Sequence, residues 1–138
     1  MSRAPPKRYI TTGLFDNAMN TGLTQKDLGS YAVTISTPER AIMEVMYNIP
    51  RDASFEEVTL LMEGLTTLRP RMLQVLLEQC RSVKVKRLFM YLAEDCHHAW
   101  VKKLDVSKVD FGKGKRMIVK GGRFNSKYNI TVPITEPA

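Results

Sequence analysis

Four consecutive stretches of the chain repeat the same amphipathic period, and this feature constrains the fold more than any other. Apolar residues recur in each stretch at the i, i+3, i+4 and i+7 positions that line one face of a helix. The four stripes are Ile42, Val45, Met46 and Ile49; Val58, Leu61, Met62 and Leu65; Leu73, Leu76, Leu77 and Cys80; and Val85, Leu88, Phe89 and Leu92. Each helix must bury its stripe, so we expect the helices to pack on one another or on a sheet.

Helix-start and helix-stop residues bracket these stripes. Ser54 and Glu57 have the spacing of a capping box, in which each side chain bonds the other residue's backbone N–H. Pro38 and Pro70 suit the first position of a helix, where no backbone N–H is needed. The other expected caps are Thr37 and Ser82, and Pro50 ends the first helix. Four separate helices are therefore predicted.

Strand-like segments lie on both sides of the helices. Residues 9–15 and 31–36 are rich in β-branched and aromatic residues and are predicted strands, whereas the turn-rich segment 16–30 is predicted to be a loop. Residues 115–133 predict a strand, a turn at Gly121–Gly122, and another strand that ends before Pro133. The order predicts an α+β fold: a central bundle of about four amphipathic helices packed with a small mixed or antiparallel sheet. We expect the N- and C-terminal strands to pair in that sheet, across the helical insert.

Length and charge limit the organisation and the partners. A chain of 138 residues suits one domain, which we place at residues 9–134, with a tether at 1–8 and a tail at 135–138. No secretion signal and no membrane span are visible, so we expect a cytoplasmic protein with reduced thiols at Cys80 and Cys96. The net charge is +7. Residues 1–68 hold 6 Lys and Arg against 8 Asp and Glu, a net of −2, whereas residues 69–138 hold 15 against 6, a net of +9.

The basic half makes a nucleic-acid partner plausible. At 100° per residue, Lys84 and Arg87 project away from the Val85–Leu92 stripe, and Lys86 lies at its border. This geometry predicts a core helix with a basic outer face, which either meets a polyanion or is only a solvated rim. The candidate nucleic-acid-binding residues are Arg69, Arg71, Arg81, Lys84, Lys86, Arg87, Lys113, Lys115, Arg116 and Lys120.

Enzymatic chemistry finds little support in the sequence. Cys96, His97 and His98 are adjacent, so their side chains diverge on a helix, and we expect no metal and no cofactor. The glycines near residue 112 lack the spacing of a phosphate-binding loop. Asp105 and Asp110 form the one alternative that we keep, a carboxylate pair for a nuclease-like enzyme. Trp100 is expected in the core. We therefore predict that the protein is not an enzyme.

Three segments, in this order, resemble a known family. They are "TPERAIMEVMYNIP" (37–50), "SFEEVTLLMEGLTTLRPRMLQVLLEQCRSVKVKRLFMYLAE" (54–94) and "KRMIVKGGRFNSKYNITVP" (115–133). They resemble the C-terminal domain of AbiEi proteins, the antitoxins and transcriptional regulators of type IV toxin–antitoxin systems in abortive phage infection. The resemblance covers about residues 9–134, and "MEGLTTLRP" with "LLEQCRSVKVKRLF" is its most specific part.

The resemblance implies antitoxin activity and autorepression by this phage-defence family. It implies that the protein counteracts a nucleotidyltransferase-like toxin, with or without a stable complex, and that operator DNA or an RNA is a partner. The family's N-terminal winged helix-turn-helix would precede residue 1, so we expect this chain to lack it, as a fragment or a natural short form. A pure protein-interaction module remains the alternative within binding functions.

Overall fold

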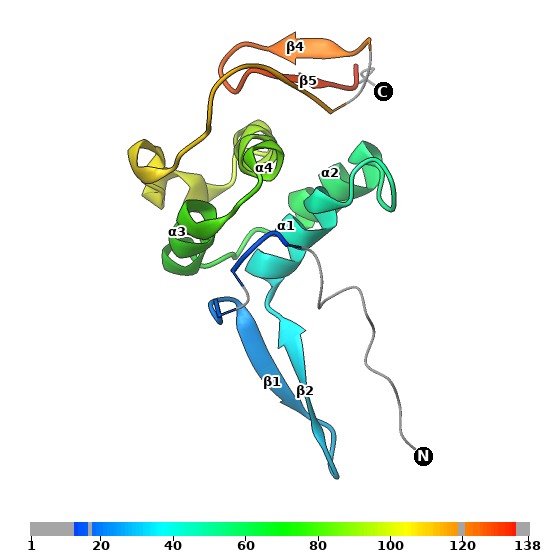
Figure 1. The fold of residues 1–138 in the computed structure, drawn as a ribbon, viewed down its shortest axis with the longest axis vertical. Coiled ribbons are helices and arrows are strands. Elements are labelled where there is room, and N and C mark those ends of the chain that lie inside the picture. Colours follow the sequence, from blue (N-terminus) through cyan, green and yellow to red (C-terminus); the bar gives the residue numbers. More distant parts are fainter. Residues whose placement is uncertain (1–12, 17, 119–120, 135–138) are drawn as a thin grey trace.

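The computed structural model describes residues 13–16, 18–118 and 121–134, which form helices and short strands in an α+β arrangement (Figure 1). The helices are α1 (Pro38–Tyr47), α2 (Phe55–Gly64), α3 (Pro70–Gln79) and α4 (Val83–Asp95), followed by the 3₁₀-helices η2 (Ala99–Lys103) and η3 (Val106–Lys108). The predicted α+β class and the four-helix centre are confirmed. The predicted tether at 1–8 and tail at 135–138 lie outside the described residues.

Local signals set the helix starts as predicted, with one exception. The capping box at α2 is complete, with Glu57 N donating to Ser54 Oγ at 3.0 Å and Ser54 N donating to Glu57 Oε1 at 2.9 Å. Ser82 caps α4 by accepting from Val85 N at 3.1 Å. Thr37 holds the cap position of α1, but its hydroxyl donates to the sulfur of Met72 instead of capping. The α1 start therefore rests on Pro38 and on packing.

The four stripes converge on one core, which runs from Leu14 to Val132 in the described chain. Leu61 is the exception, since its side chain is 51% exposed although the stripe pattern predicted burial. The buried residues of α2 are Phe55, Val58 and Met62, whose directions cluster within about 60° at 100° per residue. Leu61 points well to one side of that cluster, so it lies on the flank of the helix.

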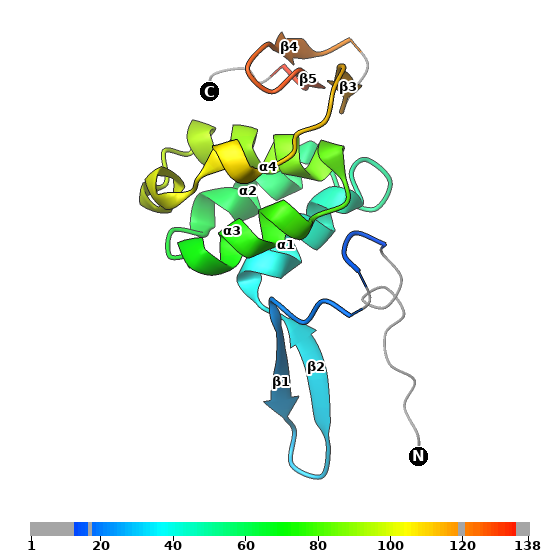
Figure 2. The same ribbon diagram turned by 60° about the vertical axis from the view of Figure 1, so that its left-hand side comes forward.

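The N-terminal half contributes a separate hairpin. Strands β1 (Leu23–Asp27) and β2 (Ala32–Ser36) pair antiparallel and extend away from the helices beyond α1 (Figures 1 and 2). The strand predicted at 31–36 is confirmed. The loop predicted at 16–30 is wrong where β1 forms. Of the strand predicted at 9–15, residues 9–12 lie outside the described residues, and 13–15 are irregular.

The C-terminal strands form a second sheet, which lies over α4 (Figure 2). Strand β5 (Ile130–Val132) is central, with β3 (Arg116–Met117) parallel to it and β4 (Arg123–Asn125) antiparallel. In the described part of the chain the two sheets do not join, so the predicted pairing of the strand at 31–36 with the C-terminal strands is wrong. Among the described residues, β1 takes β2 as its partner because the short turn between them closes a hairpin first.

Helix α4 occupies the centre of the molecule. It packs on α1 and α2 on one side and on β5 on the other. Beyond it, Trp100 is buried as predicted, with its ring 5.7 Å from that of Phe89 and its Nε1 donating to the carbonyl of Leu65 at 2.9 Å. No helix in the described part of the chain is long and apolar enough to cross a membrane.

Candidate nucleic-acid interface

The basic side chains of α4 do not form an outer face. Lys84 is partly buried, and its ammonium group donates to the backbone carbonyls of Tyr47 at 3.2 Å and Ile49 at 2.6 Å. These carbonyls lie at the C-terminal end of α1, where backbone acceptors lack partners within the helix. Lys84 therefore ties α4 to the end of α1.

Arg87 is the most deeply placed of these cations, with 2% of its surface exposed. Its Nε donates to Phe111 O at 2.8 Å, and its Nη1 donates to Gly114 O at 2.6 Å and Asn129 O at 3.2 Å. Burial, together with the nearby Arg116 guanidinium, lowers the pKa of Arg87. The positive charge of Arg87 is therefore balanced by the dipoles of backbone carbonyls and not by a carboxylate. Through these hydrogen bonds, Arg87 joins α4 to the segment that carries the C-terminal sheet.

Lys86 is likewise buried and bonded to a backbone carbonyl. It is 6% exposed, and its Nζ donates to the carbonyl of Asp110 at 2.8 Å. The prediction that Lys84 and Arg87 present a basic outer face, with Lys86 at its border, is therefore wrong. The stripe does face the bundle, but residues 106–118 and 121–134 cover the opposite side of α4. The long cationic side chains consequently meet backbone carbonyls where the sequence pattern predicted solvent.

Arg69 is also engaged in structure, although its guanidinium remains partly open to solvent. It donates to the carboxylate of Glu39 through Nε at 3.1 Å and Nη2 at 3.0 Å, and its backbone N donates at 2.8 Å. Burial alone would raise the pKa of Glu39, but these bonds outweigh burial and lower it to about 2. Arg69 is thus already paired with a carboxylate within the folded protein.

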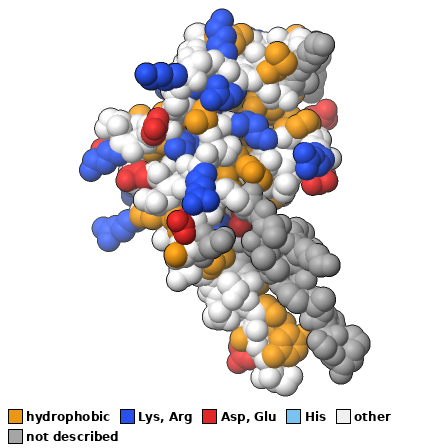
Figure 3. Space-filling model, in the orientation of Figure 1, with side chains coloured by type: hydrophobic (Ala, Val, Ile, Leu, Met, Phe, Trp, Pro, Cys, Tyr) orange, Lys and Arg blue, Asp and Glu red, His pale blue; other side chains and the backbone are white. Residues whose placement is uncertain are grey.

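The remaining candidates in the described chain are exposed: Arg71, Arg81, Lys113, Lys115 and Arg116. We call these five residues the exposed basic set. Lys120 lies outside the described residues. Figure 3 shows Lys and Arg side chains spread over the helices and the C-terminal sheet, with Asp and Glu between them. The exposed basic charge is therefore dispersed over this face.

Two parts of the exposed basic set have defined surroundings. In the segment leading into β3, Arg116 Nη1 donates to the carbonyls of Lys113 at 3.2 Å and Lys115 at 3.1 Å, and the Lys115 ammonium lies 5.0 Å from the ring centre of Phe124. These contacts hold three cations close together in the chain and in space. At the start of α4, Arg81 lies 3.5 Å from the carboxylate of Asp16, an exposed and weak pair.

Arg71 lines a hollow of about 490 Å³ on the outer side of α3. The hollow also contains two cations that were not among the candidates, Lys103 from η2 and Lys108 from η3. The complete lining is Pro70, Arg71, Gln74, Glu78, Lys103, Asp105 and Lys108. Glu78 and Asp105 make this a mixed-charge site. Lys103 and Lys108 are placed here by two 3₁₀-helices. A 3₁₀-helix of this length is too short to show an amphipathic period, so the sequence pattern could not predict the site.

The carboxylates of the nuclease alternative have local partners. Asp105 Oδ1 accepts from Ser107 N at 3.1 Å and Ser107 Oγ at 2.5 Å, and the Ser107 hydroxyl is the main reason that the pKa of Asp105 is lowered. Asp110 Oδ1 accepts from Gly112 N at 2.8 Å. Both residues thus stabilise turns of their own segments, as Asp often does in loops.

The Cys96–His98 cluster is divided between different environments. His98 is buried against the ring of Trp100, and its Nε2 lies 2.6 Å from the carbonyl of Met62. His97 is exposed and has a positive φ of 57°. Across the described ranges, no three His, Cys, Asp or Glu side chains are grouped so that they could hold a metal ion.

Comparison with known families identifies the chain. The family model of transcriptional regulators described as AbiEi antitoxins of type IV toxin–antitoxin systems matches residues 5–133. The chain belongs to this AbiEi family. No curated protein and no solved structure gave a match. The AbiEi family comprises antitoxins and transcriptional regulators, so membership implies a toxin and DNA as partners.

The AbiEi match includes all four helices and both sheets. It begins before the hairpin β1–β2 and ends after β5. The segments that carry the resemblance include the basic helix α4, whose cations the structure uses to join its parts. In this chain those cations are therefore engaged within the fold, which leaves the exposed basic set as the candidates for nucleic-acid contact.

Proposed function

We propose that this AbiEi domain acts as an antitoxin that counteracts a nucleotidyltransferase-like toxin and as an autorepressor of its own operon. The observation that carries the proposal is the family match over residues 5–133. One core extends from Leu14 to Val132, which supports the view that residues 9–134 act as a single domain. The proposal assigns the domain no catalysis, and the local turn contacts of Asp105 and Asp110 support that part of it.

Co-expression with the nucleotidyltransferase-like toxin of the same locus tests the antitoxin role. Cells that express the toxin alone should stop growing, and residues 1–138 should restore growth. Leu88→Asp, which places a charge at a fully buried position of the core, is the matched negative control. Equal growth arrest with the intact domain and with this variant would contradict the antitoxin role.

The nucleic-acid role falls to the exposed basic set. Each Lys or Arg that neutralises a phosphate releases counterions. The logarithm of the affinity for duplex DNA should therefore fall linearly with the logarithm of the salt concentration, with a slope of about −0.9 for each phosphate contact. Phosphate contacts carry no base information, and of the exposed basic set only Arg71 lies on a helix, α3. The domain alone should therefore bind weakly and with little sequence preference.

A salt series with a labelled DNA duplex and a structured RNA tests this role. The double variant Lys113→Glu, Lys115→Glu should weaken binding and reduce the salt slope, because both side chains are exposed next to Arg116. Lys26→Glu is the matched control, since Lys26 is exposed on the hairpin and carries the same charge change. No association at low salt, or equal losses in both variants, would refute this role.

The hairpin β1–β2 favours a second candidate function, a protein-interaction module. Its apolar side chains are largely exposed: Leu28 at 46%, Tyr31 at 54% and Ile35 at 40%. A two-stranded hairpin that extends from the body has two open strand edges and is poorly stabilised by itself. Tyr31→Ser should leave the fold intact and abolish co-purification with the toxin if the hairpin is the contact. Unchanged co-purification, or none with either form, would exclude the hairpin as a stable toxin contact.

A further inference from the structure

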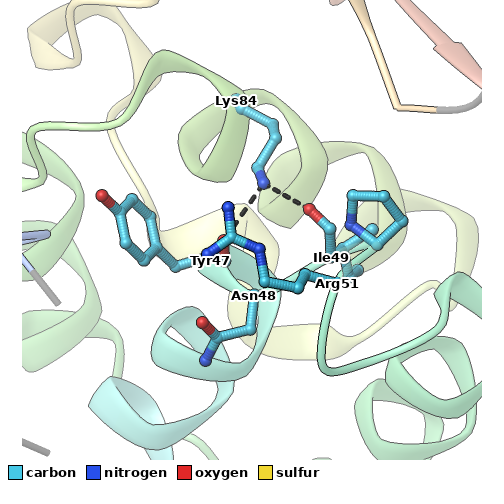
Figure 4. A pocket seen from close by; sticks show the side chains of 6 residues that line it. Tyr47, Asn48, Ile49, Arg51 and Lys84 are labelled. Atoms are coloured by element: carbon cyan, nitrogen blue, oxygen red, sulfur yellow. Dashed lines mark hydrogen bonds between the residues drawn. The ribbon is translucent and has the colours of Figure 1, made fainter. Parts of the chain in front are cut away.

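A hollow of about 320 Å³ lies at the C-terminal end of α1, and no residue of the exposed basic set lines it. Figure 4 shows how Lys84 reaches it from α4, while Arg51 enters from the turn that follows α1. The lining residues are Tyr47, Asn48, Ile49, Pro50, Arg51 and Lys84. Its size is at the lower end of the roughly 300–1,000 Å³ that small-molecule sites occupy.

Two cations meet in this hollow without a carboxylate between them. Ion pairs within the described ranges join Arg40 to Glu44, Arg69 to Glu39, Arg81 to Asp16 and Lys127 to Glu94, and none includes Lys84 or Arg51. Asp52 follows Arg51 in the chain but forms no ion pair with either cation in that part of the structure. Burial and the neighbouring Arg51 lower the pKa of Lys84, so the two charges destabilise each other.

Structural roles account for Lys84 but not for Arg51. The Lys84 ammonium uses two of its three N–H donors on the carbonyls of Tyr47 and Ile49. No hydrogen bond of the Arg51 side chain occurs within the described ranges, where its guanidinium is exposed beside Lys84. Unpaired like charges in a hollow are the arrangement expected of a site whose anion is supplied by a ligand.

We propose that this hollow binds the phosphoryl group of a small phosphorylated ligand, with Arg51 and Lys84 as its cationic contacts. The planar fork of Arg51 suits two phosphate oxygens, and the third Lys84 N–H suits one more. The ring of Tyr47, partly exposed beside Lys84 at 5.9 Å from its Nζ to the ring centre, can lie against the ligand's organic part. Arg51 and Lys84 are not members of the exposed basic set, so a variant of Arg51 tests this site without changing that set.

The test titrates inorganic phosphate and, separately, adenosine monophosphate into ¹⁵N-labelled protein at low salt. Both probes should shift amide signals of residues 47–51 and 82–86. Arg51→Gln should weaken both affinities about tenfold or more, because a charged hydrogen bond contributes roughly 1.5–3 kcal/mol. Within the described ranges the Arg51 side chain makes no hydrogen bond and no ion pair, so this variant should remain folded, whereas Lys84→Gln also removes the link to α1.

Lys26→Gln, on the distant hairpin, is the control and should leave both affinities unchanged. Equal affinities for the two probes would assign the site to free phosphate, and tighter binding of the nucleotide would assign it to a larger ligand. The proposal is overturned if neither probe shifts these signals, or if Arg51→Gln has no more effect than Lys26→Gln.

Discussion

Glu39, in the first turn of α1, accepts three hydrogen bonds from Arg69, the residue that precedes α3. The carboxylate is almost fully buried, while the guanidinium remains largely open to solvent. The backbone N–H of Arg69 is one of the three donors, so the pair fixes the start of α3 against the start of α1. An ionised Glu39 is therefore part of how two helices pack.

The first prediction is a loss of stability in acid. The pKa of Glu39 is held at about 2 in the folded protein, below its ordinary value of 4.5, so the folded state favours the ionised carboxylate. Its contribution is fully present above pH 4.5 and is lost as the pH falls towards 2. Urea melts at pH 7 and pH 3 should show Glu39 contributing roughly 2 kcal/mol of this loss.

Glu39→Gln should lower stability at pH 7 and flatten the pH dependence between pH 5 and 3. Glu56→Gln is the matched control, because Glu56 is exposed in the first turn of α2 and has no side-chain hydrogen bond within the described ranges. An unchanged pH dependence in Glu39→Gln would show that the Arg69 contact does not hold the carboxylate ionised.

The second prediction concerns Arg87. Its guanidinium donates to carbonyls of Phe111, Gly114 and Asn129, so Arg87→Met should leave buried acceptors unpaired. Such losses cost about 1–3 kcal/mol for each unpaired group, so we expect the three carbonyls together to cost at least roughly 3 kcal/mol. Denaturant melts and amide exchange of residues 110–132 measure the effect. Arg71→Met, at an exposed position, should change stability by less than about 0.5 kcal/mol.

Amide exchange also localises the role of Arg87. Faster exchange in β3 and β5 than in α1 would show that Arg87 holds the C-terminal sheet on α4. Melts that do not distinguish Arg87→Met from Arg71→Met would contradict the structural role and return Arg87 to the candidates for nucleic-acid contact.

The helices could be predicted because their signals are local. Ser54 and Glu57 are three residues apart and cap α2 by contacts within one turn, and the stripes depend on a period of a few residues. Leu61 shows the limit of the periodic pattern within a helix. The pattern gives the direction of a side chain relative to its helix axis, but it does not show how much of that helix the neighbouring helices cover.

The environment of the basic helix α4 could not be predicted, because the residues that surround its cations are remote in sequence. Arg87 bonds residues 24 to 42 positions further along the chain, and a helical wheel contains no information about them. The hairpin was missed for the opposite reason. Its turn residues suggested a loop over 16–30, whereas β1 is a polar strand whose pairing with β2 compensates for weak strand propensity. Of the candidate residues that the structure describes, the exposed basic set remains available for nucleic acid.

The third prediction concerns the two thiols. Burial raises the pKa of Cys80 to about 11, and burial with nearby Glu63 and Asp95 also raises the pKa of Cys96. The thiolate is the reactive form, so both should react slowly with iodoacetamide at pH 8. Cys96 is partly exposed and should label first, whereas Cys80 should label only on unfolding. Mass spectrometry of native and urea-treated samples decides this, and equal native labelling of both would contradict the burial of Cys80.

The last prediction tests the core itself. Leu77 on α3 and Leu88 on α4 are fully buried, and each belongs to one of the convergent stripes. Replacing either with Ala removes apolar contacts and leaves a cavity, which should cost about 2–5 kcal/mol in urea melts. Leu60→Ala makes the same chemical change on α2, where the side chain is 68% exposed, and should cost less than about 0.5 kcal/mol. If Leu77→Ala and Leu88→Ala were as mild as Leu60→Ala, the stripes could not form a common core, and the packing of α4 between the bundle and the C-terminal sheet would be wrong.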